Sequence, residues 1–253
     1  MDESTLSHIA KEAARTQVLV FAGGMGRRMG AGLPKALYTL DGKTLIDRCV
    51  SLFANSGYAD FVFLLGHGHQ DIQKYLSTVH TNDIRTLFSV DPAEEYGRGR
   101  SLLHALKNGR VDPSRRSVVV FPDDVFTDEQ TPIRVLSEHM YGVKSQNASA
   151  SLVLTQGRYW PYGVADVDEK GMVTSFTEKP FIKQPTSVGN YIFEPPVYGM
   201  LEDSPEIERE LIPRLATAKK LYAIFIPSQS WLPINTLKDF DEAEKALSGA
   251  KTM

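Results

Sequence analysis

Short apolar runs, rich in β-branched and aromatic residues, alternate with helical patterns over the first half of the chain. The runs cover residues 17–22, 60–66, 84–90 and 117–122. Apolar residues at helical spacing lie between them, at 44–56, 71–78 and 101–108. Alternating strands and helices predict a parallel sheet with helices on both faces. The run before Pro122 is continuous, VVVF, as expected for a strand covered on both sides.

The pattern changes after about residue 145, where strand-like segments follow one another. They cover residues 148–155, 163–167, 172–176, 188–193 and 221–226. Residues 168–171 are typical of a hairpin turn, and a final helix is predicted at 236–247. The chain contains no Pro/Ser-rich linker and no internal repeat, so one domain with two lobes is expected.

A glycine-rich, cationic loop follows the first predicted strand. The segment FAGGMGRRMGAGLPKAL, residues 21–37, contains five glycines and three cationic residues. Glycine lets backbone N–H groups close on an anion, which arginine and lysine neutralise. Because the net charge is −3, the loop indicates a local phosphate site rather than broad binding to nucleic acid or anionic membrane.

Two common phosphate-binding motifs do not fit this loop. A P-loop that ends in the DGKT segment, residues 41–44, would need a glycine at Leu37. A dinucleotide fingerprint that starts at Gly24 would place its third glycine at Met29. We therefore interpret DGKT as a turn before a helix, with Thr44 as a candidate N-cap.

Five sequence blocks occur in order over most of the chain. They are the glycine loop, VVVFPDDVF, PYGVADVDEKGMVTSFTEKP, SVGNYIFEP and WLPINTLKDFDEAEKAL. The ordered set resembles the sugar-1-phosphate nucleotidyltransferases, also called NDP-sugar pyrophosphorylases. The resemblance implies an α/β fold, a Rossmann-like three-layer α/β/α sandwich with a mixed, mostly parallel central sheet. It also implies a single domain, 1–253, with a nucleotide-binding half (16–145), a sugar-phosphate-binding half (146–232) and a closing C-terminal helix (233–253).

The resemblance places the triphosphate at the glycine loop. The nucleotide-binding residues that it implies are Ala22, Gly23, Gly24, Gly26, Arg28 and Ser101. Arg28 matches an arginine that contacts the leaving phosphates, and Lys35 matches a lysine on the transferring phosphate. Ser101 lies in RGRSLLHAL, a loose match to the family's block on the nucleobase side. The catalytic residues that it implies are Arg28, Lys35, Asp123 and Lys179.

Mg²⁺ is the cofactor that the resemblance implies. Asp123 ends a predicted strand and matches the family's metal-binding aspartate. Asp124 has two open roles, a water-mediated metal contact or a cap on the next turn. Many relatives place a second aspartate ligand where this chain has Pro233, so what completes the metal site stays open.

The sugar phosphate is expected at the second half of the chain. Gly163 matches a glycine that lets a sugar approach the backbone. Glu178 matches an acceptor for sugar hydroxyls, and Lys179 a cation for the sugar phosphate. Gly189 and Asn190 lie in the segment that matches the lining of the sugar pocket.

Several histidines and glycines carry open or structural interpretations. His104 is expected on a helix surface, with contact to a base edge as its alternative. Gly99 and Arg100 are expected to shape a loop. His67 and His69 lack acidic or thiol neighbours in the sequence, so we interpret them as polar turn residues before a helix rather than metal ligands.

The implied reaction is attack of a sugar-1-phosphate oxygen on the α-phosphorus of a nucleoside triphosphate, with release of pyrophosphate. UTP or dTTP and a hexose 1-phosphate are the expected substrates. One alternative is a cytidylyltransferase for an alcohol phosphate such as phosphocholine. The other is a catalytically silent, nucleotide-sugar-sensing subunit, which the proline at position 233 favours.

The chain is expected in the cytoplasm. Cys49 is the single cysteine, which excludes an internal disulfide, and its neighbours predict a packing role. The N-terminus lacks the apolar core of a signal peptide, and no stretch approaches the ~20 apolar residues of a membrane helix. Beyond the substrates, no nucleic-acid or membrane partner is expected, and a homo-oligomer is left open.

Overall fold

The computed structural model describes residues 3–24, 32–79, 84–92 and 96–250, which form a seven-stranded central sheet. The strand order is β14 (Leu221–Ile226), β8 (Ala150–Thr155), β13 (Thr186–Phe193), β6 (Ser117–Val120), β1 (Gln17–Phe21), β4 (Asp60–Leu65) and β5 (Arg85–Val90). β13 runs antiparallel to both β6 and β8, and the other neighbouring pairs are parallel. The expected mixed, mostly parallel sheet is therefore confirmed.

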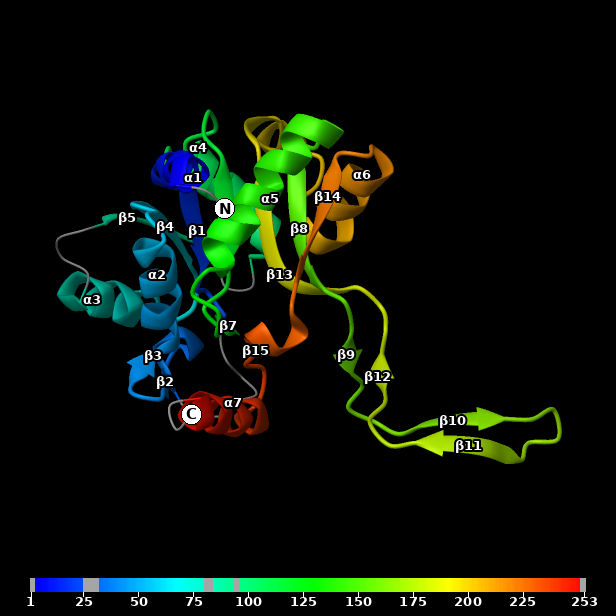
Figure 1. Ribbon diagram of the computed structural model, residues 1–253. Coiled ribbons are helices and arrows are strands. Elements are labelled where there is room, and N and C mark those ends of the chain that lie inside the picture. The colour runs from blue at the N-terminus through cyan, green and yellow to red at the C-terminus, as the bar shows by residue number, and fades with distance from the viewer. Residues whose placement is uncertain (1–2, 25–31, 80–83, 93–95, 251–253) are drawn as a thin grey trace.

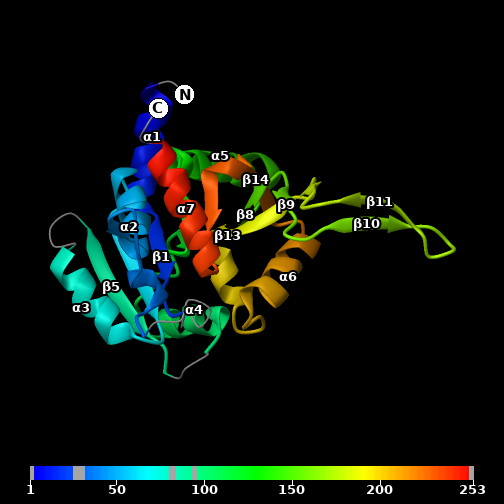
Figure 2. The same cartoon turned by 90° about the horizontal axis from the view of Figure 1, so that it is seen from below.

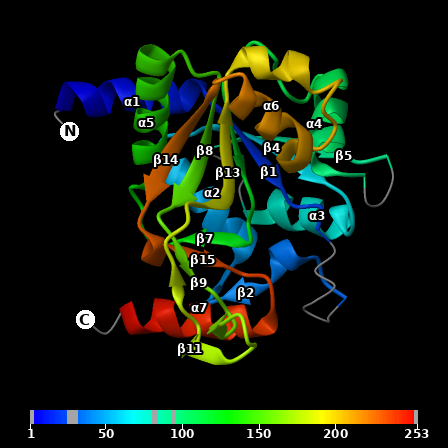
Figure 3. The same cartoon turned by 90° about the vertical axis from the view of Figure 1, so that its right-hand side faces the viewer.

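Helices cover both faces of the sheet (Figures 1 and 3). They are α1 (Glu3–Arg15), α2 (Leu45–Asn55), α3 (His69–Val79), α4 (Arg98–Lys107), α5 (Thr131–Gln146), α6 (Ile212–Thr217) and α7 (Leu237–Ala250). Side chains of β1 alternate between the layers: Val18 and Val20 pack with α1, α2, α3 and α5, while Leu19 packs with α4 and α6. The three-layer α/β/α prediction is confirmed.

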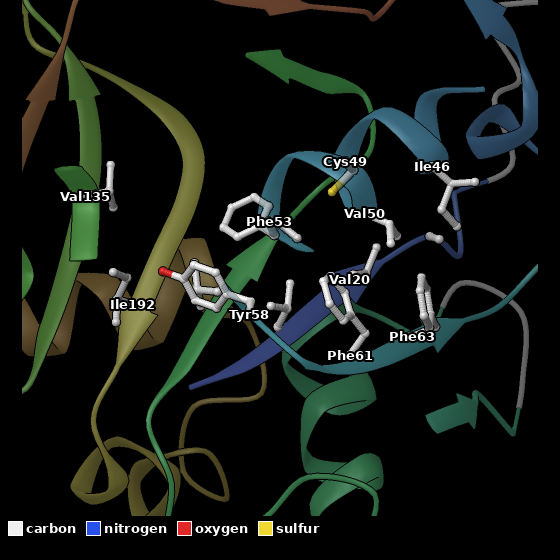
Figure 4. Packing of buried hydrophobic residues seen from close by; sticks show 14 of the residues in the cluster. Val20, Ile46, Cys49, Val50, Phe53, Tyr58, Phe61, Phe63, Val135 and Ile192 are labelled. Carbon is white, nitrogen blue, oxygen red and sulfur yellow. The ribbon is translucent and has the colours of Figure 1, made fainter. Parts of the chain in front are cut away.

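Cys49 belongs to the core between the sheet and helices α1, α2, α3 and α5. Figure 4 shows it on α2 beside Val50 and Phe53, over the strands that carry Val20 and Phe61. Burial raises the pKa of its thiol, so the group is un-ionised at neutral pH. The predicted packing role of Cys49 is confirmed.

Two short ladders lie outside the central sheet. β2 (Thr39–Leu40) pairs with β3 (Lys43–Thr44) before α2, and β7 (Asp124–Phe126) pairs with β15 (Trp231–Pro233), which joins the closing segment to the strand after β6. Thr44 caps α2 as predicted, because its side chain accepts a hydrogen bond from the Asp47 backbone at 3.1 Å. None of the helices in the described ranges is both long enough and apolar enough to cross a bilayer.

The sequence patterns missed three helices and misplaced the start of a fourth. α1, α5 and α6 were not predicted, although Ile9 of α1, Leu136 of α5 and Leu215 of α6 are buried in the core. α4 begins at Arg98 rather than residue 101, so the prediction that Gly99 and Arg100 lie in a loop was wrong.

An extended arm, residues 158–182, projects from the sheet. Its base is the ladder of β9 (Arg158–Tyr159) with β12 (Phe181–Ile182), and its outer part is the hairpin of β10 (Val164–Val167) and β11 (Val173–Thr177). Figures 1 and 2 show the hairpin pointing away from the body in two perpendicular views.

A buried polar network joins α1, α5 and the sheet. Nε2–H of His139 donates to Glu194 at 2.9 Å, and Nδ1 lies 2.8 Å from Ser151 Oγ. Arg116 pairs with Glu194 at 2.5 Å and with Glu12 at 3.0 Å. Burial opposes ionisation of Glu194, but its hydrogen bond from His139 and the charge of Arg116 outweigh this and lower its pKa. Burial lowers the pKa of His139, so its ring stays neutral.

Glu194→Gln is expected to lower the free energy of unfolding by about 2–3 kcal/mol at pH 7. The substitution removes one of the two carboxylates that pair with the mostly buried Arg116. A lowered pKa stabilises the fold above the ordinary glutamate pKa and ceases to do so as pH falls through the folded value. The difference between wild type and variant should therefore shrink toward pH 3. Urea denaturation at both pH values measures it. Glu202→Gln, at an exposed pair with Lys107, is the control and should change stability by less than about 0.5 kcal/mol.

Candidate active site

A cavity of about 280 Å³ lies at the carboxyl ends of β1, β4, β5 and β6. Parallel strands of open α/β sheets place ligands at this edge. The lining comprises residues 21–24, Lys35, Ala36, Leu64, Gly66, His67, Asp91, 96–98, Ser101 and 121–123. Four segments of the chain thus bring predicted residues to one cavity: Ala22, Gly23, Gly24, Lys35, Ser101 and Asp123.

The first glycine of the loop is required by a close approach of two strand ends. A Cβ on Gly23 would lie 2.7 Å from the backbone nitrogen of Gly66. The backbones that follow β1 and β4 can therefore meet at the cavity floor only if residue 23 is glycine. Gly26 and Arg28, both predicted to bind the nucleotide, lie outside the described residues.

A lysine and an aspartate form the charged centre of the cavity. Lys35 Nζ lies 2.5 Å from Asp123 Oδ2, and the two side chains are 14% and 34% exposed. The 3₁₀ turn Lys35–Leu37 positions the lysine, and the end of β6 positions the aspartate. The contact links the glycine loop to the acidic strand end, 88 residues apart in the chain.

The closing block packs against the acidic pair. Trp231 Nε1 donates to Asp124 Oδ1 at 2.9 Å, and the Ile234 backbone donates to the Asp123 carbonyl at 2.8 Å. Pro233 is the register partner of Asp124. Position 233 therefore lies at the expected place beside the acidic residues, but proline has no side-chain oxygen to offer a metal.

Asp124 ties β7 to the closing block through Trp231. Its side chain accepts this hydrogen bond at 2.9 Å instead of capping the next turn, and the water-mediated metal contact stays a prediction. Burial and the charge of Asp123 raise the pKa of Asp124 to about 7, while the hydrogen bond from Trp231 works against that shift. Asp123, which lines the cavity, remains the better candidate for binding a ligand.

A second carboxylate lies at the end of β5. Ser101 Oγ donates to Asp91 Oδ2 at 2.7 Å, whereas the buried Asp91 Oδ1 has no hydrogen-bond partner among the described residues. Burial raises the pKa of Asp91, against the effect of the Ser101 hydrogen bond. A buried acceptor without a partner is costly, so the geometry favours a ligand that supplies a donor.

Several lining residues were not among the predicted binding residues. Arg98 lies 4.3 Å above the ring of Phe121 and pairs with Glu208. His67, interpreted as a turn residue, lines the cavity, whereas His104 lies outside it and interacts with Asn108 at 2.8 Å. Arg98 begins the loosely matched RGRSLLHAL block, and Asp91 precedes that block at the end of β5. Their positions at a helix start and a strand end were the available signal.

Two residues predicted to bind the sugar lie beside the acidic pair. Gly189 has φ +86°, and a Cβ there would lie 2.9 Å from Asp124 Oδ2. Asn190 is buried, and its Oδ1 has no hydrogen-bond partner in the described part of the chain. Both lie on β13, which passes next to β6, but neither is among the described residues that line the cavity.

The other three predicted sugar-binding residues, Gly163, Glu178 and Lys179, lie on the arm. All three are exposed, and none is among the described residues that line the cavity. The ring of Phe176 occupies the space that a side chain at residue 163 would need. Lys179 has φ +46°, a left-handed conformation that is uncommon for lysine. The structure therefore does not bring the two predicted half-sites together.

A chelating cluster is not needed for a metal held partly by phosphates. Among the residues that the structure describes, no group of three or more His, Cys, Asp or Glu side chains could hold a metal ion. Asp123 offers a hard oxygen ligand at the cavity wall, and Mg²⁺ is commonly bound by one or two carboxylates plus substrate phosphates. The donor set therefore fits a metal that arrives with a phosphate ligand.

Comparisons with known proteins give sequence matches over most of the chain. The family model described as "Nucleotidyl transferase" matches residues 17–249. The "Probable mannose-1-phosphate guanylyltransferase 2" of Arabidopsis thaliana is 26% identical over 237 residues, which cover 88% of this chain and 63% of the relative. The "Probable mannose-1-phosphate guanylyltransferase 3" of the same plant is 27% identical over 215 residues, covering 82% of this chain and 62% of the relative.

A bacterial relative matches a shorter stretch. The "Bifunctional protein GlmU" of Burkholderia ambifaria (strain MC40-6) is 28% identical over 165 residues, or 64% of this chain and 33% of the relative. The chain thus spans less than two thirds of the length of these relatives.

Proposed function

The chain belongs to the nucleotidyl transferase family, as its sequence blocks indicated, and on that premise we propose that it joins a nucleoside triphosphate to a sugar 1-phosphate. The products are an NDP-sugar and pyrophosphate. The observation that carries this proposal is the Lys35–Asp123 pair, which lies in a cavity beside the glycine-rich segment at the sheet edge where ligands bind.

The chemistry requires two polyanions to approach each other. An oxygen of the sugar phosphate attacks the α-phosphorus, and the bond to the pyrophosphate oxygen breaks, so catalysis consists of alignment and charge neutralisation. Lys35 donates to the transferring phosphate, and the backbone of residues 22–24 lies against the triphosphate. Arg28 stays a prediction for the leaving phosphates.

Asp123 is the proposed Mg²⁺ ligand. When bound, Mg²⁺ would neutralise phosphate charge at the α-phosphorus. Asp123 would hold the ion from the end of β6 together with substrate phosphates, since position 233 supplies no ligand. Lys35, which contacts Asp123 in this structure, is then the cation placed to donate to the phosphate.

Guanosine triphosphate is the nucleotide that the cavity favours. Guanine presents N1–H and N2–H side by side, and a carboxylate accepts both. We assign this acceptor pair to Asp91: Ser101 donates to Oδ2, and Oδ1 has no hydrogen-bond partner among the described residues. Because Oδ1 is buried, the carboxylate must turn toward the cavity when the base binds. Uracil and thymine instead flank one N–H with two carbonyl oxygens, which a carboxylate repels. UTP and dTTP were expected from the resemblance, but Asp91 and the names of the relatives favour GTP.

The sugar phosphate is proposed to be a hexose 1-phosphate, in line with the mannose 1-phosphate in the names of the plant relatives. We keep the division into a nucleotide half, 16–145, and a sugar-phosphate half, 146–232. Lys179 and Glu178 stay assigned to the sugar phosphate and sugar hydroxyls on sequence grounds.

Lys179→Ala is expected to raise the KM for the sugar phosphate about tenfold, the scale of one lost charged hydrogen bond, while the KM for the nucleotide changes little. Steady-state kinetics with each substrate varied measures both constants. Lys183→Ala, an exposed lysine just beyond the arm, is the matched control and should change neither. Equal effects of Lys179→Ala on both constants would contradict the assignment.

A pyrophosphate-release matrix tests the proposed function. The purified chain is mixed with Mg²⁺, each of GTP, UTP, dTTP, CTP and ATP, and either a hexose 1-phosphate or phosphocholine. Release with GTP and a hexose phosphate supports the proposal. Release only with CTP and phosphocholine favours the cytidylyltransferase, and nucleotide binding without any release favours the silent subunit.

A further inference from the structure

The arm presents one apolar and one polar face. Opposed residues of an antiparallel pair share a face. Ala165 with Phe176, and Val167 with Val173, form the apolar face. Val164 with Thr177, and Asp166 with Ser175, form the polar face, on which Ser175 Oγ donates to Asp166 at 2.5 Å. A sheet with such a division buries its apolar side against another layer.

The arm exposes an unusual number of large hydrophobic side chains. Ten are 37–70% exposed: Tyr159, Trp160, Tyr162, Val164, Val167, Met172, Val173, Phe176, Phe181 and Ile182. The five rings alone expose on the order of 500 Å². With the aliphatic residues, of which Val164 lies on the polar face, the exposed apolar area of the whole arm approaches the ~800 Å² that each partner of a standard protein interface buries. A two-stranded ribbon in water is marginally stable by itself, so the arm needs a cover.

The body of the same chain does not provide that cover. The arm joins the body only at its base, and the hairpin points away from the sheet and helices in both Figure 1 and Figure 2. Val173 and Phe176 remain 63% and 65% exposed with the whole described chain in place.

The two ends of the arm carry opposite net charges. Carboxylates predominate at the tip: Asp166, Asp168 and Glu169, against Lys170. Cations predominate at the base: Arg158 and Lys179, with Lys183 just beyond it, against Glu178. Such a gradient complements itself when two arms lie antiparallel about a two-fold axis, because each tip meets the other base. An arm with this pattern therefore matches a second copy of itself.

We propose that the arm is a dimerisation element. Two copies of this chain pack arm against arm, apolar face to apolar face, with the tip of each arm beside the base of the other. The proposal shares Lys179 and Glu178 with the proposed sugar-phosphate site, but it does not depend on the nucleotidyl transfer reaction.

Two valines on opposite faces give a matched test. Val173→Ser removes an apolar side chain from the apolar face, and the dimer Kd is expected to rise at least about tenfold because both copies lose it. Val164→Ser makes the same change on the polar face and should alter Kd less than about twofold. Sedimentation equilibrium measures Kd, and an unchanged thermal midpoint shows that the body still folds. Val173→Ser with Phe176→Ser should give a monomer at micromolar concentration.

Disulfide trapping tests the orientation of the arms. A mixture of Glu169→Cys and Lys183→Cys chains is expected to form a tip-to-base disulfide between copies, whereas Glu169→Cys alone is not. Buried Cys49 should give no cross-link in wild type. A monomeric wild type at 100 μM, equal effects of the two valine variants, a dimer that survives the double variant, or a tip-to-tip disulfide would each overturn the proposal.

Discussion

Asp123→Asn is expected to lower kcat by at least about a hundredfold, the scale seen when one preorganised electrostatic element of an active site is lost. The substitution keeps the size of the side chain and removes its charge. Asp123 lines the cavity and contacts Lys35 at 2.5 Å, so its carboxylate is the group placed to hold Mg²⁺ against substrate phosphates. Turnover at saturating substrates, repeated over a Mg²⁺ titration, measures both the loss and the weakened metal dependence.

The adjacent aspartate is the matched control for this result. Asparagine at position 124 keeps an acceptor for Trp231 Nε1 and removes only the charge. Asp124→Asn should therefore lower kcat much less than Asp123→Asn. Equal losses would show that the acidic pair acts as a unit, and undiminished turnover of Asp123→Asn would contradict the metal role.

Asp91→Asn is expected to lower kcat/KM for GTP by about 10–100-fold, because a bidentate contact to a base contributes about 1–3 kcal/mol. An asparagine amide presents one donor and one acceptor, so it cannot accept both N1–H and N2–H of guanine. The variant should lose little with UTP. Its selectivity, measured as the ratio of kcat/KM values for the two nucleotides, should therefore fall.

Ser101→Ala separates base recognition from positioning. It removes the hydrogen bond to Asp91 at 2.7 Å but leaves both carboxylate oxygens. GTP should therefore remain the preferred nucleotide, and its kcat/KM should fall less than in Asp91→Asn. A wild-type preference for UTP, or an Asp91→Asn variant with unchanged selectivity, would contradict the guanine assignment.

The sheet could be predicted largely because its strands are buried on both faces. Val118, Val119 and Val120 are each at most 2% exposed, and such strands read as unbroken apolar runs. The antiparallel direction of β13 could not be predicted this way, since its burial pattern does not encode direction. α5 was missed because its buried face includes Thr131, His139 and Gly142, which are not large apolar residues, and this weakens the helical period of hydrophobicity.

The residues of the candidate site also differ in whether the sequence can predict them. Lys35 and Asp123 belong to short motifs that follow strands, and the topology of a parallel sheet brings such positions to one edge. Asp91 is a single carboxylate after a strand without glycine neighbours, so only the cavity reveals it. The arm shows where motif matching stops being sufficient. Residues 163, 178 and 179 match a sugar site in sequence, whereas the exposed side chains of Phe176, Val167 and Val173 indicate a protein interface.

The central claim is most directly tested by ³¹P NMR of the purified chain with GTP, mannose 1-phosphate and Mg²⁺. The account predicts that the mannose 1-phosphate resonance disappears while pyrophosphate and a diphosphate-bridged nucleotide sugar form in equal amounts, and that Asp123→Asn slows both together. The contradictory result is a folded protein that binds nucleotide yet leaves the resonances of the triphosphate and of every sugar phosphate and alcohol phosphate offered unchanged.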